Sequence, residues 1–506
     1  MPMFNVFMLY EVNPTTWFYL SWLMITGIFF KFRRVWSVRN LDLFLLLSLG
    51  PGLLLIGNNF YWGYVVTLSV LFLLVIRMLC DPMMNRRPLL EVNLSKSGLI
   101  FCCVALMLFN IAGLVLTQTR DYSESQVNAS LEQLMMFHLN SQLLDAEESQ
   151  NATTGNGESG SLASGAGVGN AENVAKVKNP SLVHAPGLPF FTRLSDFPRT
   201  WRYEKIQNIQ NIQNAGVNPT RPQNATTRMA REQLNTPAVQ LGHFPVFPIR
   251  QIRWTIFLAT LAQIAIVTGI VMTGWAHFEN FNTGIAAATL YLLLPYVCQI
   301  PSRLDHLIPG ALIVWAVFSW RLPALSGVLL GIAAALCYYP LFLFPLWCAF
   351  YWSRGLWRFL LTSVGTFLFL ICISIPIAGG WSEFLAQSGD IFGCIGLFSR
   401  SAAGFWEIEG QSVFYRLPVI AIYMMLVLFL TFWPSRKNIG TLMSSSAALM
   451  AGAQFCHPFQ GGTYMAWFLP LMILVIFRPN LEDRTAYRTI GRRRRRLVSM
   501  SASENL

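Results

Sequence analysis

Residues 254–352 decide the fold, because five strongly apolar segments follow one another there with few charges between them. They are WTIFLATLAQIAIVTGIVM (254–272), IAAATLYLLLPYVCQI (285–300), HLIPGALIVWAVFSW (306–320), LPALSGVLLGIAAAL (322–336) and PLFLFPLWCAFYW (340–352). A bilayer core of about 30 Å is crossed by about 20 apolar residues in a helix. In lipid, only helices and closed barrels satisfy every backbone polar group. The stretch therefore predicts several membrane-spanning helices.

The composition of the whole chain agrees with this prediction. Of the 506 residues, 54% are hydrophobic and only 12% are charged, which is typical of many spans and not of one soluble core. The net charge of +12 does not indicate nucleic-acid binding, since no basic face with interleaved aromatic residues is present. The nine cysteines form no CxxC pair and are typical of small buried hydrophobic residues. Membrane lipids are the expected partners, and nucleic acid is not.

The apolar segments predict an all-α polytopic transmembrane bundle of about 11–13 spans. Four spans are expected in an N-terminal membrane region, residues 1–117, and nine in the main bundle, residues 250–480. A basic cytoplasmic tail, residues 481–506, follows. The expected spans are 15–30, 41–57, 61–76, 98–116, 252–273, 283–300, 307–320, 323–338, 340–352, 357–378, 412–433, 441–457 and 462–478.

Residues 118–249 interrupt the apolar pattern. This segment is polar and contains the run NATTGNGESGSLASGAGVGNAEN (151–173), whose small and polar side chains bury too little apolar area to offset the entropy of the chain. We expect a long, largely disordered, low-complexity loop outside the membrane. Three N-x-S/T sequons, at Asn128, Asn151 and Asn224, fit chance matches in such sequence better than a glycosylation signal.

The distribution of basic residues predicts the orientation, because Lys and Arg gather in cytoplasmic loops. If the N-terminus is outside, the alternation of thirteen spans places most basic clusters in the cytoplasm. Two exceptions arise: Arg250 and Arg253 are placed outside, and the loop around His277 is placed inside without any Lys or Arg. The clusters placed in the cytoplasm are Lys31 to Arg39, Arg77 to Lys96, Arg321, Arg354 with Arg358, Arg436 with Lys437, and Arg492–Arg496.

On the opposite, outer face this topology gathers the ionisable and aromatic residues that are candidates for a site. Ionisable groups at a membrane boundary are costly unless they are solvated or paired, so each is a functional candidate. A second interpretation of Asp305 is open: it would stabilise the N-terminus of the helix that follows. The loop 379–411, with its carboxylates and aromatic residues, also fits binding of sugars or polar headgroups. The candidates are Arg303, Asp305, His306, Tyr338, Tyr339 and His457.

His277 and Glu279, in WAHFENFNTG, form a second group of candidate residues. A histidine and a carboxylate two residues apart can share a proton, but no third ligand accompanies them, so no metal site is expected. The sequence contains no HExxH, P-loop or GxSxG motif. No cofactor is expected.

Several runs of the sequence resemble known membrane proteins. HFENFNTGIAAATLYLLLPY (277–296), SRLDHLIPGALIVWA (302–316), GVLLGIAAALCYYPLFLFPLWCAFYWSRG (327–355) and QFCHPFQGGTYMAWFLPLMILVIFRPNLEDR (454–484) resemble a family of uncharacterised polytopic proteins from planctomycete-type bacteria. More distantly, the order of short helices, a cytoplasmic Arg and a YYP turn is similar to the GT-C membrane glycosyltransferases. The first resemblance implies a bacterial inner-membrane protein.

The GT-C resemblance implies transfer of a sugar from a polyprenyl-phosphate donor to an acceptor hydroxyl at the outer leaflet. The catalytic candidates are then Glu279 or Asp305 as the base, with Arg303, His306 and His457 near the phosphate; Tyr338 and Tyr339 are candidates for substrate binding. The chain departs from the GT-C pattern because it has no DxD motif, and Cys337 and Tyr338 replace the usual basic residue. The alternatives are a transporter or flippase, with LIPGAL and CYYPLFLFPLW as discontinuous helices, and a non-enzymatic scaffold.

Overall fold

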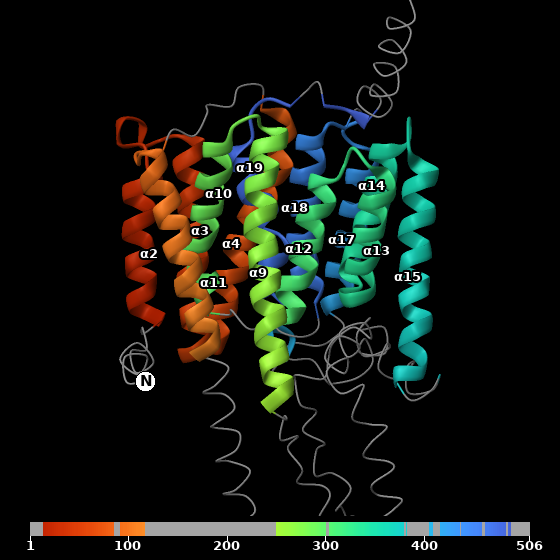
Figure 1. Cartoon of the computed structure of the whole chain (residues 1–506), viewed down its shortest axis with the longest axis horizontal. Coiled ribbons are helices and arrows are strands. Elements are labelled where there is room, and N and C mark those ends of the chain that lie inside the picture. The colour runs from red at the N-terminus through yellow and green to blue at the C-terminus, as the bar shows by residue number, and fades with distance from the viewer. Residues whose placement is uncertain are drawn as a thin grey trace, which may run out of the picture. The chain divides into compact units, whose positions relative to one another are not determined.

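The computed structural model describes residues 14–84, 92–116, 249–299, 303–378, 381, 404–407, 415–435, 437–457, 461–481 and 484–486. Within them the chain is helical, and one isolated bridge pairs Asn438 with Thr485 (Figure 1). The predicted all-α bundle is confirmed. All described residues except 249–253 belong to one compact unit. Three predicted features lie outside the described residues. They are the expected loop, of which only residue 249 is described, most of the loop 379–411, and the Arg492–Arg496 run.

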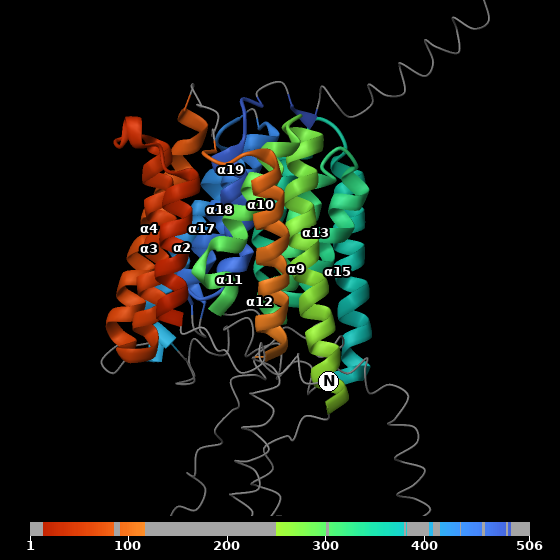
Figure 2. The same ribbon diagram turned by 60° about the vertical axis from the view of Figure 1, so that its left-hand side comes forward.

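The helices run roughly parallel in both views of the bundle (Figures 1 and 2). Short 3-10 segments precede or follow several of them. The helices are α2 (Pro14–Phe29), α3 (Val38–Asn58), α4 (Phe60–Cys80), the helix Lys96–Leu116, α9 (Ile249–His277), α10 (Phe281–Leu293), α11 (Pro295–Gln299), α12 (Leu304–Phe318), α13 (Pro323–Cys337), α14 (Phe344–Tyr351), α15 (Leu356–Ala378), α17 (Arg416–Phe432), α18 (Ile439–Cys456) and α19 (Leu469–Phe477).

Five described helices are long and apolar enough to cross a membrane. They are Val38–Ile56, Tyr61–Met83, Lys96–Leu116, Arg253–His277 and Leu356–Pro376. At a rise of about 1.5 Å per residue, each matches or approaches the thickness of the hydrocarbon core. The protein is therefore a multi-pass membrane protein.

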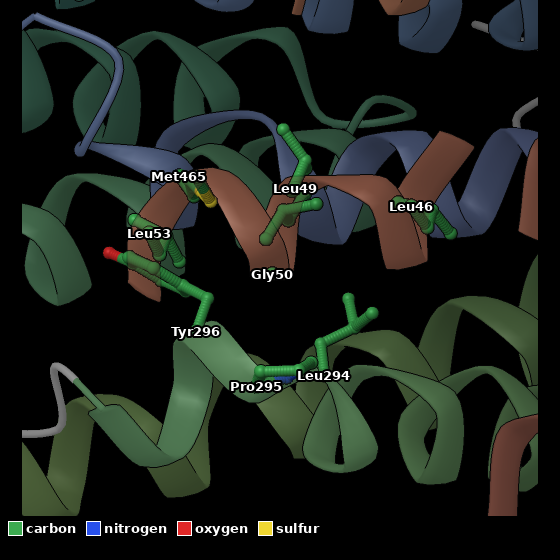
Figure 3. Close-up of a pocket in the computed structure, with 9 residues that line it drawn as sticks. Leu46, Leu49, Gly50, Leu53, Leu294, Pro295, Tyr296 and Met465 are labelled. Atoms are coloured by element: carbon green, nitrogen blue, oxygen red, sulfur yellow. The ribbon is translucent and has the colours of Figure 1, made fainter. Parts of the chain in front are cut away.

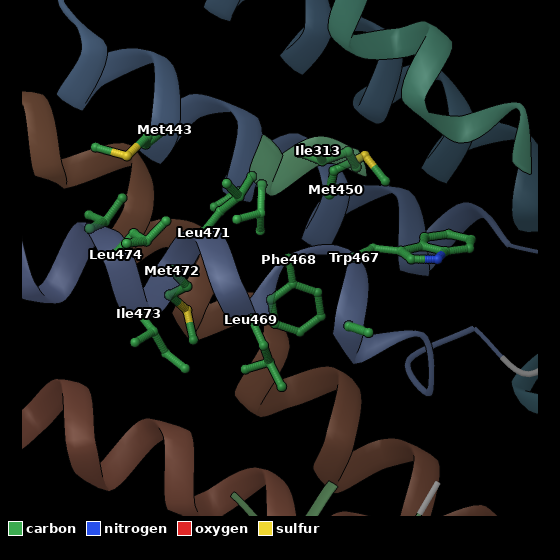
Figure 4. Close-up of a cluster of buried hydrophobic side chains, with 14 of the residues drawn as sticks. Ile313, Met443, Met450, Trp467, Phe468, Leu469, Leu471, Met472, Ile473 and Leu474 are labelled. Carbon is green, nitrogen blue, oxygen red and sulfur yellow. The ribbon is translucent and has the colours of Figure 1, made fainter. Parts of the chain in front are cut away.

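The helices differ strongly in how much of their surface the rest of the bundle buries. Only 17% of the apolar window of α15 and 22% of that of Lys96–Leu116 is buried, whereas every residue of α18 except Phe455 is buried. Figure 4 shows side chains of α18 and α19 packed together with one from α12. An outer helix has to cover the whole apolar thickness, but an inner helix contacts protein along its length.

The turns between helices form two ends of the bundle, and one of them carries most of the described basic residues. We call it the basic end, defined by Lys31, Arg33, Arg321, Arg354, Lys437 and Arg484. Two contacts connect its turns: Arg478 pairs with Asp81, and the backbone N–H of Ile439 donates to the carbonyl of Arg484. The turns that the sequence predicts to be cytoplasmic thus share one end, while the orientation of that end stays a prediction.

The opposite end, which we call the Arg303 end, is formed where helices break at prolines. α10 stops at Leu293, Leu294 is extended, and Pro295 begins α11, as expected because the residue before a proline disfavours the helical region. α13 ends at Cys337, and Tyr338 has a φ of +28°, so the chain turns sharply into the 3-10 segment Tyr339–Leu343. The YYP turn named in the sequence therefore lies between α13 and α14.

Candidate functional site

The candidate site lies at the Arg303 end, where α11, α12, α13 and the segment between α18 and α19 meet. Arg303 is the N-cap residue of α12, and Asp305 and His306 belong to its first turn. Tyr339 follows α13, and His457 follows α18. The structure brings together these five residues, which are scattered over more than 150 positions of the sequence.

Arg303 and Asp305 form a two-pronged ion pair. The Nε atom of Arg303 donates to Oδ1 of Asp305 at 3.2 Å, and Nη2 donates to Oδ2 at 2.7 Å. The side chain of Arg303 is 32% exposed and that of Asp305 only 10%. Arg303 is the N-cap residue of α12 and its side chain makes no capping bond, while Asp305 lies in the first turn, where a carboxylate stabilises a helix N-terminus, so both interpretations of Asp305 stay open. A cation is unfavourable beside a helix N-terminus, and Asp305 compensates it.

His306 lies between a carboxylate and a phenol. Its Nδ1 atom is 2.7 Å from the hydroxyl of Tyr296, and its Nε2 atom is 3.7 Å from Oδ2 of Asp305. The imidazole is fully buried. The 2.7 Å contact with Tyr296 orients the imidazole, whereas the 3.7 Å distance to Asp305 is too long for a hydrogen bond and is an ion pair only when the imidazole is protonated.

A continuous group of aromatic rings connects His306 with His457. The ring of Tyr464 lies 4.3 Å from that of His306 and 4.3 Å from that of His457, measured between centroids. Tyr339 stacks on His457 at 4.9 Å, and the Arg303 guanidinium carbon lies 5.5 Å from the centroid of Tyr464. Such ring pairs and cation–π contacts each stabilise an arrangement by about 1 kcal/mol. The cluster is therefore preorganised.

The segment between α18 and α19 is positioned by Gln454 and Trp467. Oε1 of Gln454 accepts from the backbone N–H groups of Gly462 and Tyr464, at 3.1 and 3.2 Å. Gly462 has a φ of +99°, which favours glycine. The indole N–H of Trp467 donates to the backbone carbonyl of Asp305 at 2.9 Å. These contacts fix Tyr464 against the start of α12.

Glu279 does not join this cluster. It lies in the turn between α9 and α10 at the basic end and pairs with Arg484. The same turn contacts the other end of α12, since Nε2 of His277 is 2.8 Å from the carbonyl oxygen of Phe318. α12 separates Asp305 from that contact by about 20 Å at 1.5 Å per residue. Glu279 and Asp305 therefore belong to opposite ends of the bundle.

The charges around Glu279 explain the unusual loop at His277. Although this turn has no Lys or Arg of its own, it receives Arg484 from the C-terminal segment. Burial lowers the pKa of the neighbouring Arg321, Arg484 lowers it further, and Glu279 raises it. The loop thus belongs to the basic end through contacts that are distant in sequence.

A small crevice adjoins the cluster at Tyr296. Its volume is about 10 Å³, and it lies between α3, the break between α10 and α11, and residues 465–469 (Figure 3). This is room for about one water molecule, and the lining is mainly leucine. A sugar or lipid therefore does not fit in this crevice as it stands, and the exposed part of Arg303 is the accessible cation of the cluster.

Sequence analysis missed Tyr296, Tyr464, Trp467 and Gln454. Gln454 could have indicated the site from the sequence, because a side-chain amide in a membrane helix needs polar partners nearby. Among the described residues, no group of three or more His, Cys, Asp or Glu side chains is placed to hold a metal ion. The chemistry that the cluster offers is anion binding by Arg303 and proton transfer by Asp305 and His306.

Comparisons with known proteins do not extend this description. No protein-family model, curated protein or solved structure matches the chain.

Proposed function

We propose that this multi-pass membrane protein is a GT-C-like glycosyltransferase that uses a polyprenyl-phosphate sugar at the leaflet facing the Arg303 end. The observation that carries the proposal is the carboxylate of Asp305. The structure describes four carboxylate side chains: Asp42, Asp81, Glu279 and Asp305. All four pair with an arginine: Asp42 with Arg77, Asp81 with Arg77 and Arg478, Glu279 with Arg484 and Asp305 with Arg303. Asp305 differs because its arginine is the most exposed of these, at 32%, and because a buried histidine lies beside it.

In the proposed reaction, Arg303 binds the phosphate of the donor, because a guanidinium matches the oxygens of a phosphate. Arg303 then shares its N–H groups between phosphate and Asp305, which makes the carboxylate a better proton acceptor. The acceptor oxygen attacks the anomeric carbon, and the bond from that carbon to the phosphate oxygen breaks. Asp305 takes the acceptor proton, and polyprenyl phosphate leaves with its charge neutralised by Arg303.

His306 and Tyr296 position Asp305 in this proposal. A buried imidazole beside the carboxylate restricts its orientation, and the phenol in turn orients the imidazole. Both residues act through Asp305 and not on the sugar.

The test is turnover of radiolabelled polyprenyl-phosphate sugars by the full chain in lipid nanodiscs. Asp305→Asn keeps the shape of the side chain but removes the proton acceptor, so consumption of the donor is expected to stop. Asp42→Asn is the matched control, since Asp42 is a buried carboxylate paired with Arg77 at 2.6 Å. It is expected to lower stability and keep turnover. If both variants behave alike, Asp305 has only a structural role.

A flippase is the second candidate, favoured by the break between α10 and α11 beside the site. If the protein only moves lipid between leaflets, the polyprenyl-phosphate sugar in the same nanodisc preparation is not consumed. Reconstituted vesicles that translocate the polyprenyl-phosphate sugar without consuming it would therefore replace the enzyme proposal with the flippase.

A further inference from the structure

The turn between α2 and α3 exposes a group of large apolar side chains at the basic end. The exposed fractions are 65% for Phe32, 55% for Val35 and 101% for Trp36. Lys31 and Arg33 lie in the same turn, and Arg33 is exposed. We call residues 31–36 the FRRVW turn, after its sequence from Phe32 to Trp36.

A buried amide holds this turn in place. Asn40, in the first turn of α3, accepts from the backbone N–H of Lys31 at 3.1 Å and donates to the carbonyls of Lys31 and Val35, each at 3.1 Å. Ser37 caps α3 by accepting from the backbone N–H of Asn40 at 3.3 Å. The apolar side chains are thus exposed on a turn fixed at both ends, and their exposure is not a result of a loose chain.

Hydrogen bonds from Asn93 fix the end of α2, which leads into the turn. The side-chain amide of Asn93, which precedes the helix Lys96–Leu116, donates to the carbonyls of Gly27 and Phe30 at 3.2 and 3.0 Å. The backbone N–H of Asn93 also donates to the carbonyl of Ile28 at 2.9 Å. Asn40 of α3 and Asn93, which precedes the helix Lys96–Leu116, therefore position the FRRVW turn and the end of α2.

The location of the turn identifies what surrounds it. α2 ends at Phe29 and α3 begins at Val38, so the turn lies at the level where membrane-spanning helices end. Tryptophan and phenylalanine at this level insert among lipid headgroups, and adjacent cations attract anionic ones. Water alone would leave three large apolar side chains exposed on a fixed turn, which is unfavourable.

We infer that the FRRVW turn binds anionic phospholipid headgroups, with Lys31 and Arg33 contacting phosphate and with Phe32, Val35 and Trp36 inserted beside it. This inference does not depend on the proposed enzymatic activity. A protein partner at the same turn is the alternative that the experiments exclude or establish.

The first test measures how many phosphatidylglycerol molecules the detergent-purified full chain retains, by native mass spectrometry with phosphatidylcholine as the reference lipid. The double variant Lys31→Gln/Arg33→Gln is expected to bind phosphatidylglycerol about 25-fold more weakly, since each cation near an anionic surface contributes about fivefold. The control is Arg354→Gln/Arg358→Gln, which removes the same charge at the same end. Equal losses in the two double variants would overturn the inference.

The second test replaces Trp36 with the photo-crosslinking residue benzoylphenylalanine in the full chain, irradiated in native membranes. Attachment of phospholipid, seen as a mass shift of one lipid, is the expected result. A crosslinked band containing a second polypeptide, without lipid attachment, would assign the turn to a protein partner. A product with neither would mean that Trp36 faces water, and it would also overturn the inference.

Discussion

The guanidinium of Arg303 makes two hydrogen bonds to the carboxylate of Asp305, two residues later, at 3.2 and 2.7 Å. Because a lysine has one ammonium group and no fork, it cannot reproduce both bonds. Arg303→Lys is therefore expected to lower kcat/KM for the polyprenyl-phosphate donor by about 100-fold, and Arg303→Gln by more, as with other lost charge-stabilising donors. Steady-state donor consumption in nanodiscs gives the values. Unchanged kinetics for Arg303→Lys would mean that the reaction needs the positive charge at position 303 but not the two hydrogen bonds to Asp305.

Tyr296→Phe removes the hydroxyl that lies 2.7 Å from Nδ1 of His306. If Tyr296 positions the histidine, kcat is expected to fall by about tenfold, and its pH profile should shift, while the protein stays folded. The matched control is Tyr423→Phe, because the buried hydroxyl of Tyr423 has no hydrogen-bond partner in the described residues. That variant should be as active as the parent and slightly more stable. An unshifted pH profile for Tyr296→Phe would remove the positioning role.

Sequence alone located much of the candidate site, because charge and position along the chain carry the signal. The alternation of spans placed Arg303, Tyr339 and His457 on one face, and they meet there. Tyr464 escaped detection because aromatic residues are common in membrane helices, so its contacts with two histidines appear only after α18 and α19 pack. The alternation of spans also placed the loop around His277, which contains Glu279, on the side of the basic clusters, and the structure places it at the basic end. What no local pattern reveals is its ion pair with Arg484, 205 residues later.

The fold class was predictable because an apolar chain in lipid can satisfy its backbone polar groups only as helices or as a closed barrel. The pattern of apolar residues does not reveal which helices lie inside the bundle and which face the lipid. α18, with its serines and alanines, is less apolar than the outer α15, yet it is the buried one. Small residues allow close helix packing inside the bundle, whereas large apolar residues face the lipid equally well.

The packing of α13 on α15 depends on two glycines four residues apart, Gly327 and Gly331. A Cβ atom on Gly331 would lie against the carbonyl oxygen of Ser363, and one on Gly327 would approach the carbonyl of Phe359 at 2.6 Å. Gly331→Leu is expected to destabilise the protein by about 1–3 kcal/mol, as overpacking does. Thermal unfolding in detergent checks this. Gly365→Leu, on α15, is the control, because a Cβ there meets nothing within 4 Å; equal destabilisation would contradict the proposed contact.

Two ion pairs at the basic end should differ in their contribution to stability. Arg478 pairs with Asp81, and both side chains are at least 97% buried, whereas the carboxylate of Glu279 that pairs with Arg484 is 78% exposed. Asp81→Asn is expected to cost about 3–5 kcal/mol, because it leaves a buried arginine without its main counter-charge. Glu279→Gln should cost less than about 1 kcal/mol.

The same Glu279→Gln variant separates the two catalytic candidates. Because Glu279 lies in the turn that contacts the other end of α12, and α12 is about 20 Å long between Asp305 and Phe318, the substitution should leave donor consumption within about twofold of the parent. Chemical unfolding gives the stabilities, and the radiolabel assay gives the turnover. Loss of turnover in Glu279→Gln with Asp305→Asn active would move the site to the basic end.

The orientation of the bundle decides which leaflet supplies the donor. The helix Lys96–Leu116 begins beside Asn93, which is hydrogen-bonded to the end of α2 at the basic end, so the chain leaves this helix at the other end. If the basic end is cytoplasmic, Gly160→Cys should react with an impermeant thiol reagent in intact spheroplasts of a variant without the native cysteines. Thr489→Cys, in the basic tail, should react only after permeabilisation. The reverse pattern would place Arg303 and Asp305 at the cytoplasmic leaflet, and the donor sugar would then have to be offered from the cytoplasm.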